Sequence, residues 1–280
     1  METGRPSQTA LLVASYRARA SARPDPVCDD PWAAALAGEQ GATLTRDYDA
    51  IYPHMELWTA VRTAYIDARV RRALALGARQ VVVLGAGFDT RAARLASPGV
   101  RFFEVDRAET QREKLARLGA VVVGYPADAA TYVACDFEAQ DFVVELAAAG
   151  FAPSEPALVV WEGVTPYLTE AAVRATLRRV ASGLAGESAI VFDHLRKKIV
   201  AGAVRDDKDL ASRAFVGDLG EPLVFGVDDV LPLLYEEGFR RVRSLNFDEA
   251  CLEHTGTYDR DRKFRFQGLA VASRAARQLP

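Results

Sequence analysis

A continuous apolar segment followed by two closely spaced glycines constrains the fold of this chain most strongly. Residues 80–84 read QVVVL, and Gly85 and Gly87 follow directly in VVVLGAGFDTRAARL. A β-branched run without polar alternation is typical of a strand that is covered on both faces, and the residues after the glycines have a helical pattern. The sequence therefore predicts a buried strand, a tight turn and a helix, the first unit of a doubly wound α/β fold.

Strand and helix patterns continue to alternate along the chain. We expect further strands at 101–106, near 121 with a continuation at 132–135, at 157–161, 188–193, 240–245 and 264–272, with helices at 110–118, 139–149, 170–185 and 228–237. This order predicts a mostly parallel, seven-stranded sheet with helices on both faces.

The regions outside the alternation suggest how the chain is divided. Residues 1–76 read as helices and are expected to form an N-terminal helical cap, whereas residues 195–227 are expected to form an inserted helical lid. Residues 77–194 would then form the ligand-binding core, and 228–280 its C-terminal part. Because α/β folds of this length often form one unit, we expect a single domain over residues 1–280.

Composition argues against several classes of protein. Lys plus Arg number 35 against 38 Asp plus Glu, so the net charge of −3 gives no general reason to expect a nucleic acid or membrane partner. Cys28, Cys135 and Cys251 lie far apart without a CxxC spacing, which argues against a disulfide framework and a metal site. We find no pattern of a signal peptide or a membrane span, and we expect a cytoplasmic protein.

The predicted strand ends carry groups that suit a nucleotide-like ligand. In a doubly wound sheet ligands bind outside the carboxyl ends of the strands, where Gly85 and Gly87 allow close approach to the backbone. Glu104 and Asp106 end the second strand about 20 residues further on, where an acid accepts hydrogen bonds from ribose hydroxyls. Alternate strand residues face the same way, so both carboxylates could share one side, with Asp106 the better ribose ligand.

Two later strand ends extend this set. Asp136 and Phe137 could bond an adenine amino group and cover its ring, and the alternative is a helix cap beside a core phenylalanine. Glu162, next to Gly163, would lie near the charged end of the ligand, unless it forms a surface salt bridge. A nicotinamide dinucleotide is less favoured, because its fingerprint wants a third glycine where Thr90 stands.

Taken together, these segments resemble the leucine carboxyl methyltransferase-like family of class I S-adenosylmethionine-dependent methyltransferases, in its bacterial small-molecule O-methyltransferase branch. The similarity covers nearly the whole chain and is carried by TALLVASYRARASARPDPVCDDPWAAAL, RTAYID, VVVLGAGFDTRAARL, FFEVD, CDF and WEGVTPYL. It implies a Rossmann-like fold and S-adenosyl-L-methionine as the cofactor. Ala64 and Phe137 depart from residues that are common in the family.

The resemblance also implies roles for individual residues. Gly85 would contact the methionine part of the cofactor and Asp106 the ribose. The adenine would lie against Asp136 and Phe137, and the region around the amino group against Glu162. Arg62, from RTAYID, matches the arginine that pairs with the cofactor's carboxylate, a task that suits a bidentate guanidinium.

The expected reaction is methyl transfer to an oxygen of a small molecule such as a polyketide-type acid or phenol. A carboxylate acceptor, which we favour here, needs no general base, whereas a phenol needs one. We name no catalytic residue, but His194 and Tyr16 are candidate substrate contacts. A protein C-terminal carboxyl group as substrate, an NAD(P)-dependent oxidoreductase and a non-catalytic interaction protein remain alternatives.

Aromatic side chains in the expected cap and lid are candidates for an apolar pocket wall. They are Tyr16, Tyr48, Tyr52, Trp58, Tyr65, Phe215, Phe225 and Tyr258.

Overall fold

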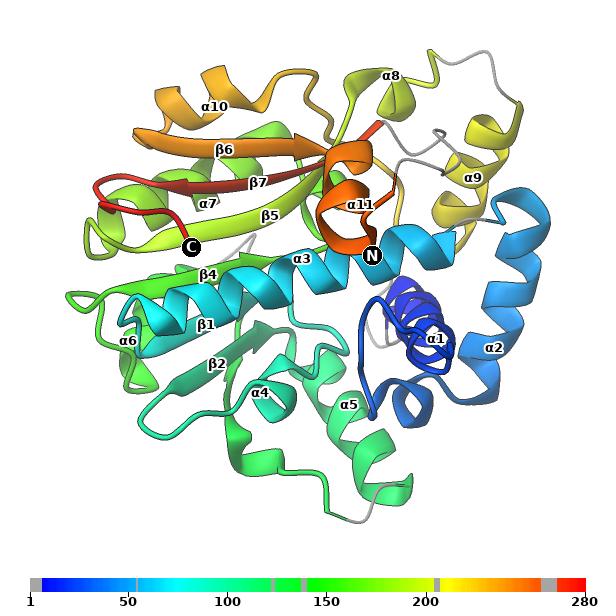
Figure 1. Cartoon of the computed structure of the whole chain (residues 1–280), viewed down its shortest axis with the longest axis horizontal. Helices are drawn as coiled ribbons and strands as arrows, with labels where there is room; N and C mark the ends of the chain where they lie inside the picture. Colours follow the sequence, from blue (N-terminus) through cyan, green and yellow to red (C-terminus); the bar gives the residue numbers. More distant parts are fainter. Residues whose placement is uncertain (1–6, 54, 122–123, 137–139, 204–206, 258–265) are drawn as a thin grey trace.

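The computed structural model describes the chain apart from residues 1–6, 54, 122–123, 137–139, 204–206 and 258–265. Its centre is one seven-stranded sheet (Figure 1). The strands are β1 (Gln80–Leu84), β2 (Arg101–Asp106), β3 (Ala130–Ala134), β4 (Ala157–Trp161), β5 (Ala189–Leu195), β6 (Arg241–Asn246) and β7 (Gln267–Ser273). The predicted fold class, a mostly parallel, Rossmann-like sheet flanked by helices, is confirmed.

The strands follow the order β3-β2-β1-β4-β5-β7-β6. The first five pair in parallel, and β7 runs antiparallel to both β5 and β6. The direction of winding reverses between β1 and β4, and ligands bind outside the strand ends at such a switch point. The glycine turn after β1 lies at this place.

Helices cover both faces of the sheet and its carboxyl edge. They are α1 (Gln8–Ser21), α2 (Ala33–Ile51), α3 (Met55–Ala75), α4 (Arg91–Arg94), α5 (Ala108–Val121), α6 (Phe142–Ala148), α7 (Glu170–Gly183), α8 (Lys197–Val200), α9 (Asp207–Asp218), α10 (Val230–Glu236) and α11 (Phe247–Thr255), with short 3-10 turns η1 (Ala127–Ala129) and η2 (Thr165–Tyr167). Figure 1 shows α3 crossing one face of the sheet, while α1, α2 and α9 lie beyond the ends of the strands. No helix in the described ranges is long and apolar enough to cross a membrane.

The buried strand β1 separates two hydrophobic cores. Val81 and Val83 pack in one core, to which α3 and α11 contribute. Val82 and Leu84 face the opposite core, to which α6, α7 and α10 contribute. Because successive side chains of a strand point to opposite faces, a strand between two cores must be apolar at every position. This requirement explains the unbroken apolar run VVVL at residues 81–84, which ends where the glycine turn begins.

One sequence-based expectation about local structure was wrong, and one helix was not expected. Val121 ends helix α5 instead of belonging to a strand. The helix reaches this far with support from an ion pair between Glu113 and Arg117, which lie one turn apart. Helix α11 was not predicted, although Asn246 and Glu249 form a reciprocal capping box at its start.

Candidate functional site

A large cavity lies between the carboxyl ends of the strands and the helices of the expected cap and lid. Its volume is about 1660 Å³, and its walls include residues from the turn after β1, the ends of β2, β4 and β5, and helices α1, α3 and α9. Pockets for one drug-sized ligand have volumes of roughly 300–1,000 Å³. This cavity therefore has room for two small molecules side by side.

The glycine turn forms one wall of the cavity and is tied to the end of β2. Gly85 has a φ of +63°, and a Cβ atom there would lie 2.5 Å from a methyl carbon of Val164. Gly87 also has a positive φ, and its N–H donates to the Asp106 carboxylate over 2.6 Å. The backbone N–H of Arg107 donates to the other oxygen of this carboxylate over 2.7 Å. Glycine is therefore required at position 85 for space as well as for conformation.

Asp106 and Glu104 differ in their environments although both belong to β2. Asp106 lines the cavity. Burial raises its pKa, and the backbone donors Gly87 and Arg107 act in the opposite direction. Glu104 is fully buried beside Lys114 and does not line the cavity. Burial raises the pKa of Glu104 to about 7 even though Lys114 opposes the shift. Asp106 alone faces the cavity from this strand, so the two carboxylates do not form a pair there.

Arg62 of α3 connects the cap helix to the ends of two strands. Its Nε donates to Glu162 over 2.8 Å, and its Nη1 donates to Asp193 over 3.0 Å. The second oxygen of Glu162 lies 2.6 Å from Nη1 of Arg91. Burial alone would raise the pKa of Glu162, but Arg91 and Arg62 lower it to about 2. Glu162 is therefore an ionised carboxylate between two guanidinium groups, and Arg62, Glu162 and Asp193 all border the cavity.

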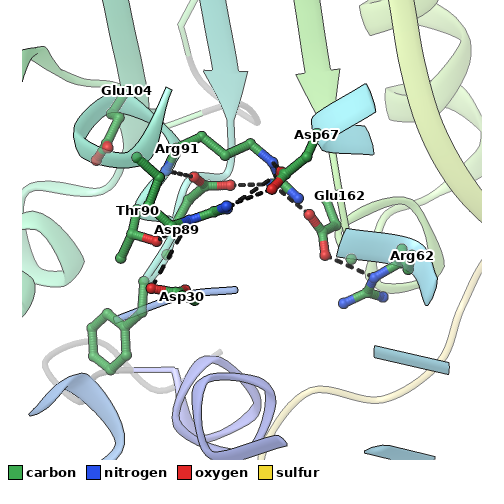
Figure 2. Close-up of polar contacts among 12 residues, drawn as sticks. Asp30, Arg62, Asp67, Asp89, Thr90, Arg91, Glu104 and Glu162 are labelled. Atoms are coloured by element: carbon green, nitrogen blue, oxygen red, sulfur yellow. Dashed lines mark hydrogen bonds and ion pairs between the residues drawn. The ribbon is translucent and has the colours of Figure 1, made fainter. Parts of the chain in front are cut away.

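The contacts around Arg91 extend this cluster into a buried ion network (Figure 2). Arg91 pairs with Asp67 of α3 and with Asp89 of the glycine turn, in addition to Glu162. Arg94 also pairs with Asp67. These groups come from helix α3, the glycine turn, α4 and the residue after β4, so the network fixes α3 to the wall of the cavity.

The third strand contributes part of its predicted set. Asp136 follows β3 and lines the cavity, and its backbone N–H donates to the side-chain oxygen of Gln140 over 2.9 Å. Gln140 lines the cavity as well. Phe137, the predicted partner of Asp136, lies outside the described residues. Asp136 shares this cavity with the five other predicted cofactor-binding residues that the structure describes. They are Arg62, Gly85, Gly87, Asp106 and Glu162.

The two predicted substrate contacts do not line the large cavity. His194 alternates with Asp193 on β5, so its ring lies on the other face of the sheet, close to Gly268 and in a separate small pocket of about 240 Å³. Burial lowers its pKa to about 4. Tyr16 is fully buried, and its hydroxyl donates to Asp49 over 2.9 Å. The structure therefore gives no support to either residue as a substrate contact.

Sequence reasoning missed several residues that line the cavity. Asp193 could have been found by the strand-end rule that selected Asp106, because it lies near the end of the fifth strand. Glu221 and Tyr167 have no local signal of this kind. Of the proposed aromatic residues, Tyr48, Tyr52 and Trp58 line the cavity, and Tyr258 lies outside the described residues.

Solved structures with the same arrangement define the class of fold. A DUF574 family protein from Streptomyces avermitilis is similar with a TM-score of 0.66 and 12% identity, over 97% of this chain and 99% of that chain. A candidate methyltransferase from Thermobifida fusca has a TM-score of 0.65 and 14% identity, over 98% and 97% of the two chains. At such low identity the likeness shows the fold, which is Rossmann-like and found in methyltransferases.

The sequence comparisons define the family. The leucine carboxyl methyltransferase family matches residues 10–181 of this chain. The chain belongs to this family, and the sequence-based identification of a methyltransferase is confirmed.

Bacterial relatives support this assignment. Candidate S-adenosyl-L-methionine-dependent methyltransferases from Saccharopolyspora erythraea and Frankia alni are similar to it. The first is 36% identical over 207 residues, which cover 71% of each chain. The second is 37% identical over 192 residues, which cover 62% of this chain and 63% of the relative.

Proposed function

We propose that this methyltransferase binds S-adenosyl-L-methionine at the strand ends of the large cavity and transfers its methyl group to an oxygen of a small molecule bound beside it. The observation that carries the proposal is that one cavity joins Gly85, Asp106 and Glu162 with aromatic residues of the cap. The predicted cofactor is also the one in the names of the relatives described above.

The donor set of the cavity suits this cofactor. Nine carboxyl side chains are among its described lining residues, against three guanidinium groups. Asp89 and Glu162 are paired with Arg91 and Asp193 with Arg62, and the remaining carboxyl groups still favour a ligand with a positive sulfonium. Asp106 can accept hydrogen bonds from the ribose. Arg62 uses Nε and Nη1 within the protein, and no hydrogen bond from its Nη2 is found in the described part of the chain, so this group can bind the cofactor's carboxylate. Bound there, the cofactor would supply an electrophilic methyl group.

The contacts between cap and lid favour a small substrate over the C-terminus of a protein. The hydroxyl of Tyr48 lies 2.5 Å from the Ser212 hydroxyl, and the Tyr52 hydroxyl donates to Asp209 over 3.1 Å. All four residues line the cavity, and the two contacts join α9 to α2 and to the residue that follows it. Contacts that close the cap and lid over the cavity in this way exclude water from the methyl transfer, and they also restrict the entry of a polypeptide chain.

Calorimetric titration tests the proposed cofactor site. We expect S-adenosylhomocysteine to bind and NADH not to bind. We expect Asp106→Asn to weaken S-adenosylhomocysteine binding about tenfold or more, because the ribose would lose a charged acceptor. Glu109→Gln is the matched control, since Glu109 also lines the cavity but is exposed. Unchanged affinity in folded Asp106→Asn, or tight binding of NADH instead, would count against the proposal.

A further inference from the structure

We infer that the methyl acceptor is an uncharged hydroxyl compound, held between the hydroxyl of Tyr167 and the carboxylate of Glu221, and that Glu221 takes up the hydroxyl proton. This inference rests on the proposed function and replaces the carboxylate acceptor that the sequence favoured. It names a substrate class and a catalytic residue for the acceptor side of the cavity, which we define as the part lined by Tyr48, Tyr52, Ile199, Val216, Glu221 and Phe266.

Glu221 is a buried carboxylate with one oxygen available to a ligand. Only 6% of the residue is exposed, and the Thr9 hydroxyl donates to its Oε2. No hydrogen bond to its Oε1 is found within the described residues, although Glu221 lines the cavity. A buried carboxylate with a free oxygen is costly unless a donor reaches it, and a substrate hydroxyl would be such a donor.

The segment that carries Glu221 is anchored to the ends of two strands. The N–H of Val224 donates to the carbonyl of Pro166 over 2.7 Å, just after β4. The N–H of Val227 donates to the carbonyl of Leu195, the last residue of β5, over 2.7 Å. The carboxylate is therefore held by the same strand ends that carry the proposed cofactor site.

Tyr167 lies close enough to both Arg62 of the proposed cofactor site and Glu221 for their charges to act on its hydroxyl. It lines the cavity from η2, and no hydrogen bond of its hydroxyl is found in the described part of the chain. Burial is the largest cause that raises the pKa of Tyr167, and the negative charge of Glu221 raises it further. The positive charge of Arg62 acts in the opposite direction. The hydroxyl therefore keeps its proton at neutral pH and can donate a hydrogen bond to the acceptor oxygen.

The rest of the acceptor side suits an apolar, uncharged molecule. The aromatic rings of Tyr48, Tyr52 and Phe266 form part of its wall. Asp209, which accepts a hydrogen bond from Tyr52, also lines the cavity and adds a carboxyl group to that of Glu221. A substrate carboxylate would meet these two groups of its own charge, and this repulsion disfavours its binding.

The proposed step accounts for every proton and electron pair. The acceptor oxygen forms a bond to the methyl carbon while Glu221 takes the hydroxyl proton on Oε1. The bond between this carbon and sulfur breaks, and its electron pair stays on sulfur as the positive charge is lost. A hydroxyl needs such a base because it is a weak nucleophile while protonated, whereas an ionised carboxylate needs none.

Two probes of the same skeleton test the inference by binding. At neutral pH 2-naphthol is uncharged and 2-naphthoate is an anion. In calorimetric titrations of the full chain saturated with S-adenosylhomocysteine, we expect 2-naphthol to bind about tenfold or more tighter than 2-naphthoate, because only the anion is repelled by the wall. In Glu221→Gln, the glutamine oxygen can still accept from Thr9, and we expect the difference between the probes to shrink several-fold.

Asp218→Asn is the matched control, because Asp218 lines the same cavity but is exposed to solvent, where charge effects are weak. We expect it to leave the ratio of the two affinities nearly unchanged. Equal affinities, tighter binding of the naphthoate, binding of neither probe, or an unaltered ratio in Glu221→Gln would overturn the inference while S-adenosylhomocysteine still binds. If S-adenosylhomocysteine itself does not bind, the proposed function fails, and this inference fails with it.

Discussion

Replacing Arg91 with methionine removes the cation at the centre of the buried ion network. The Arg91 guanidinium is nearly inaccessible to solvent, and it pairs with Asp67, Asp89 and Glu162. Methionine has a similar length but no charge. In the variant, each of these three buried carboxylates therefore lacks the Arg91 cation with which it pairs in the parent protein. We expect Arg91→Met to lower the free energy of unfolding substantially at neutral pH.

Two arguments give the size of this loss. Removing one partner of a buried ion pair typically costs about 3–5 kcal/mol. Against the effect of burial, Arg91, Arg62 and Arg17 together lower the pKa of Glu162 to about 2 instead of its usual 4.5. The whole shift corresponds to about 3 kcal/mol at neutral pH, and Arg91 supplies the first part of it. Because the folded-state pKa is lowered, this contribution is complete above pH 4.5 and is lost as the pH falls toward 2. We therefore expect a loss of about 3–5 kcal/mol at pH 7 and a smaller one near pH 3.

Urea denaturation of both proteins at pH 7 and pH 3 measures this difference. The matched control is Arg112→Met, because Arg112 pairs with Glu109 on the exposed surface of α5. A surface pair of this kind contributes about 0–1 kcal/mol, so the control should unfold almost as the parent does. A loss below about 1 kcal/mol for Arg91→Met, or an equal loss at both pH values, would refute the argument from buried charge.

Two further variants test the structure around the cavity. Gly85→Ala should destabilise the fold by about 1–3 kcal/mol in thermal denaturation, because φ is positive there and Val164 leaves no space for a Cβ atom. Gly99→Ala is the control for the effect of φ alone, because Gly99 also has a positive φ but no atom lies near its Cβ position. Equal losses of stability in the two variants would argue against a clash at Gly85. Glu104 has a pKa raised to about 7 from 4.5. Its contribution to stability therefore falls as the pH rises from 4.5 to 7, and this dependence should weaken in Glu104→Gln. An unchanged pH profile of unfolding would contradict the raised pKa.

Local sequence patterns were sufficient for much of the fold and for part of the candidate site. The run QVVVL and the glycines after it predicted β1, its turn and the edge of the sheet where ligands bind. Asp106 could be selected because a strand end and its spacing from the glycines are both visible in sequence. Val121 was misassigned because an apolar run of a few residues has the same pattern at the end of a helix as in a strand.

The sequence alone determined the class of sheet, the family and the strand ends that face one cavity, because these follow from short-range patterns and motif order. Only the tertiary structure decided that Arg62 lies between Glu162 and Asp193, which are 100 and 131 residues away along the chain. It also placed His194 on the opposite face of the sheet and brought Glu221 to the acceptor side. Such pairings depend on which buried groups meet after the cap and lid pack against the core, and no local pattern records that choice.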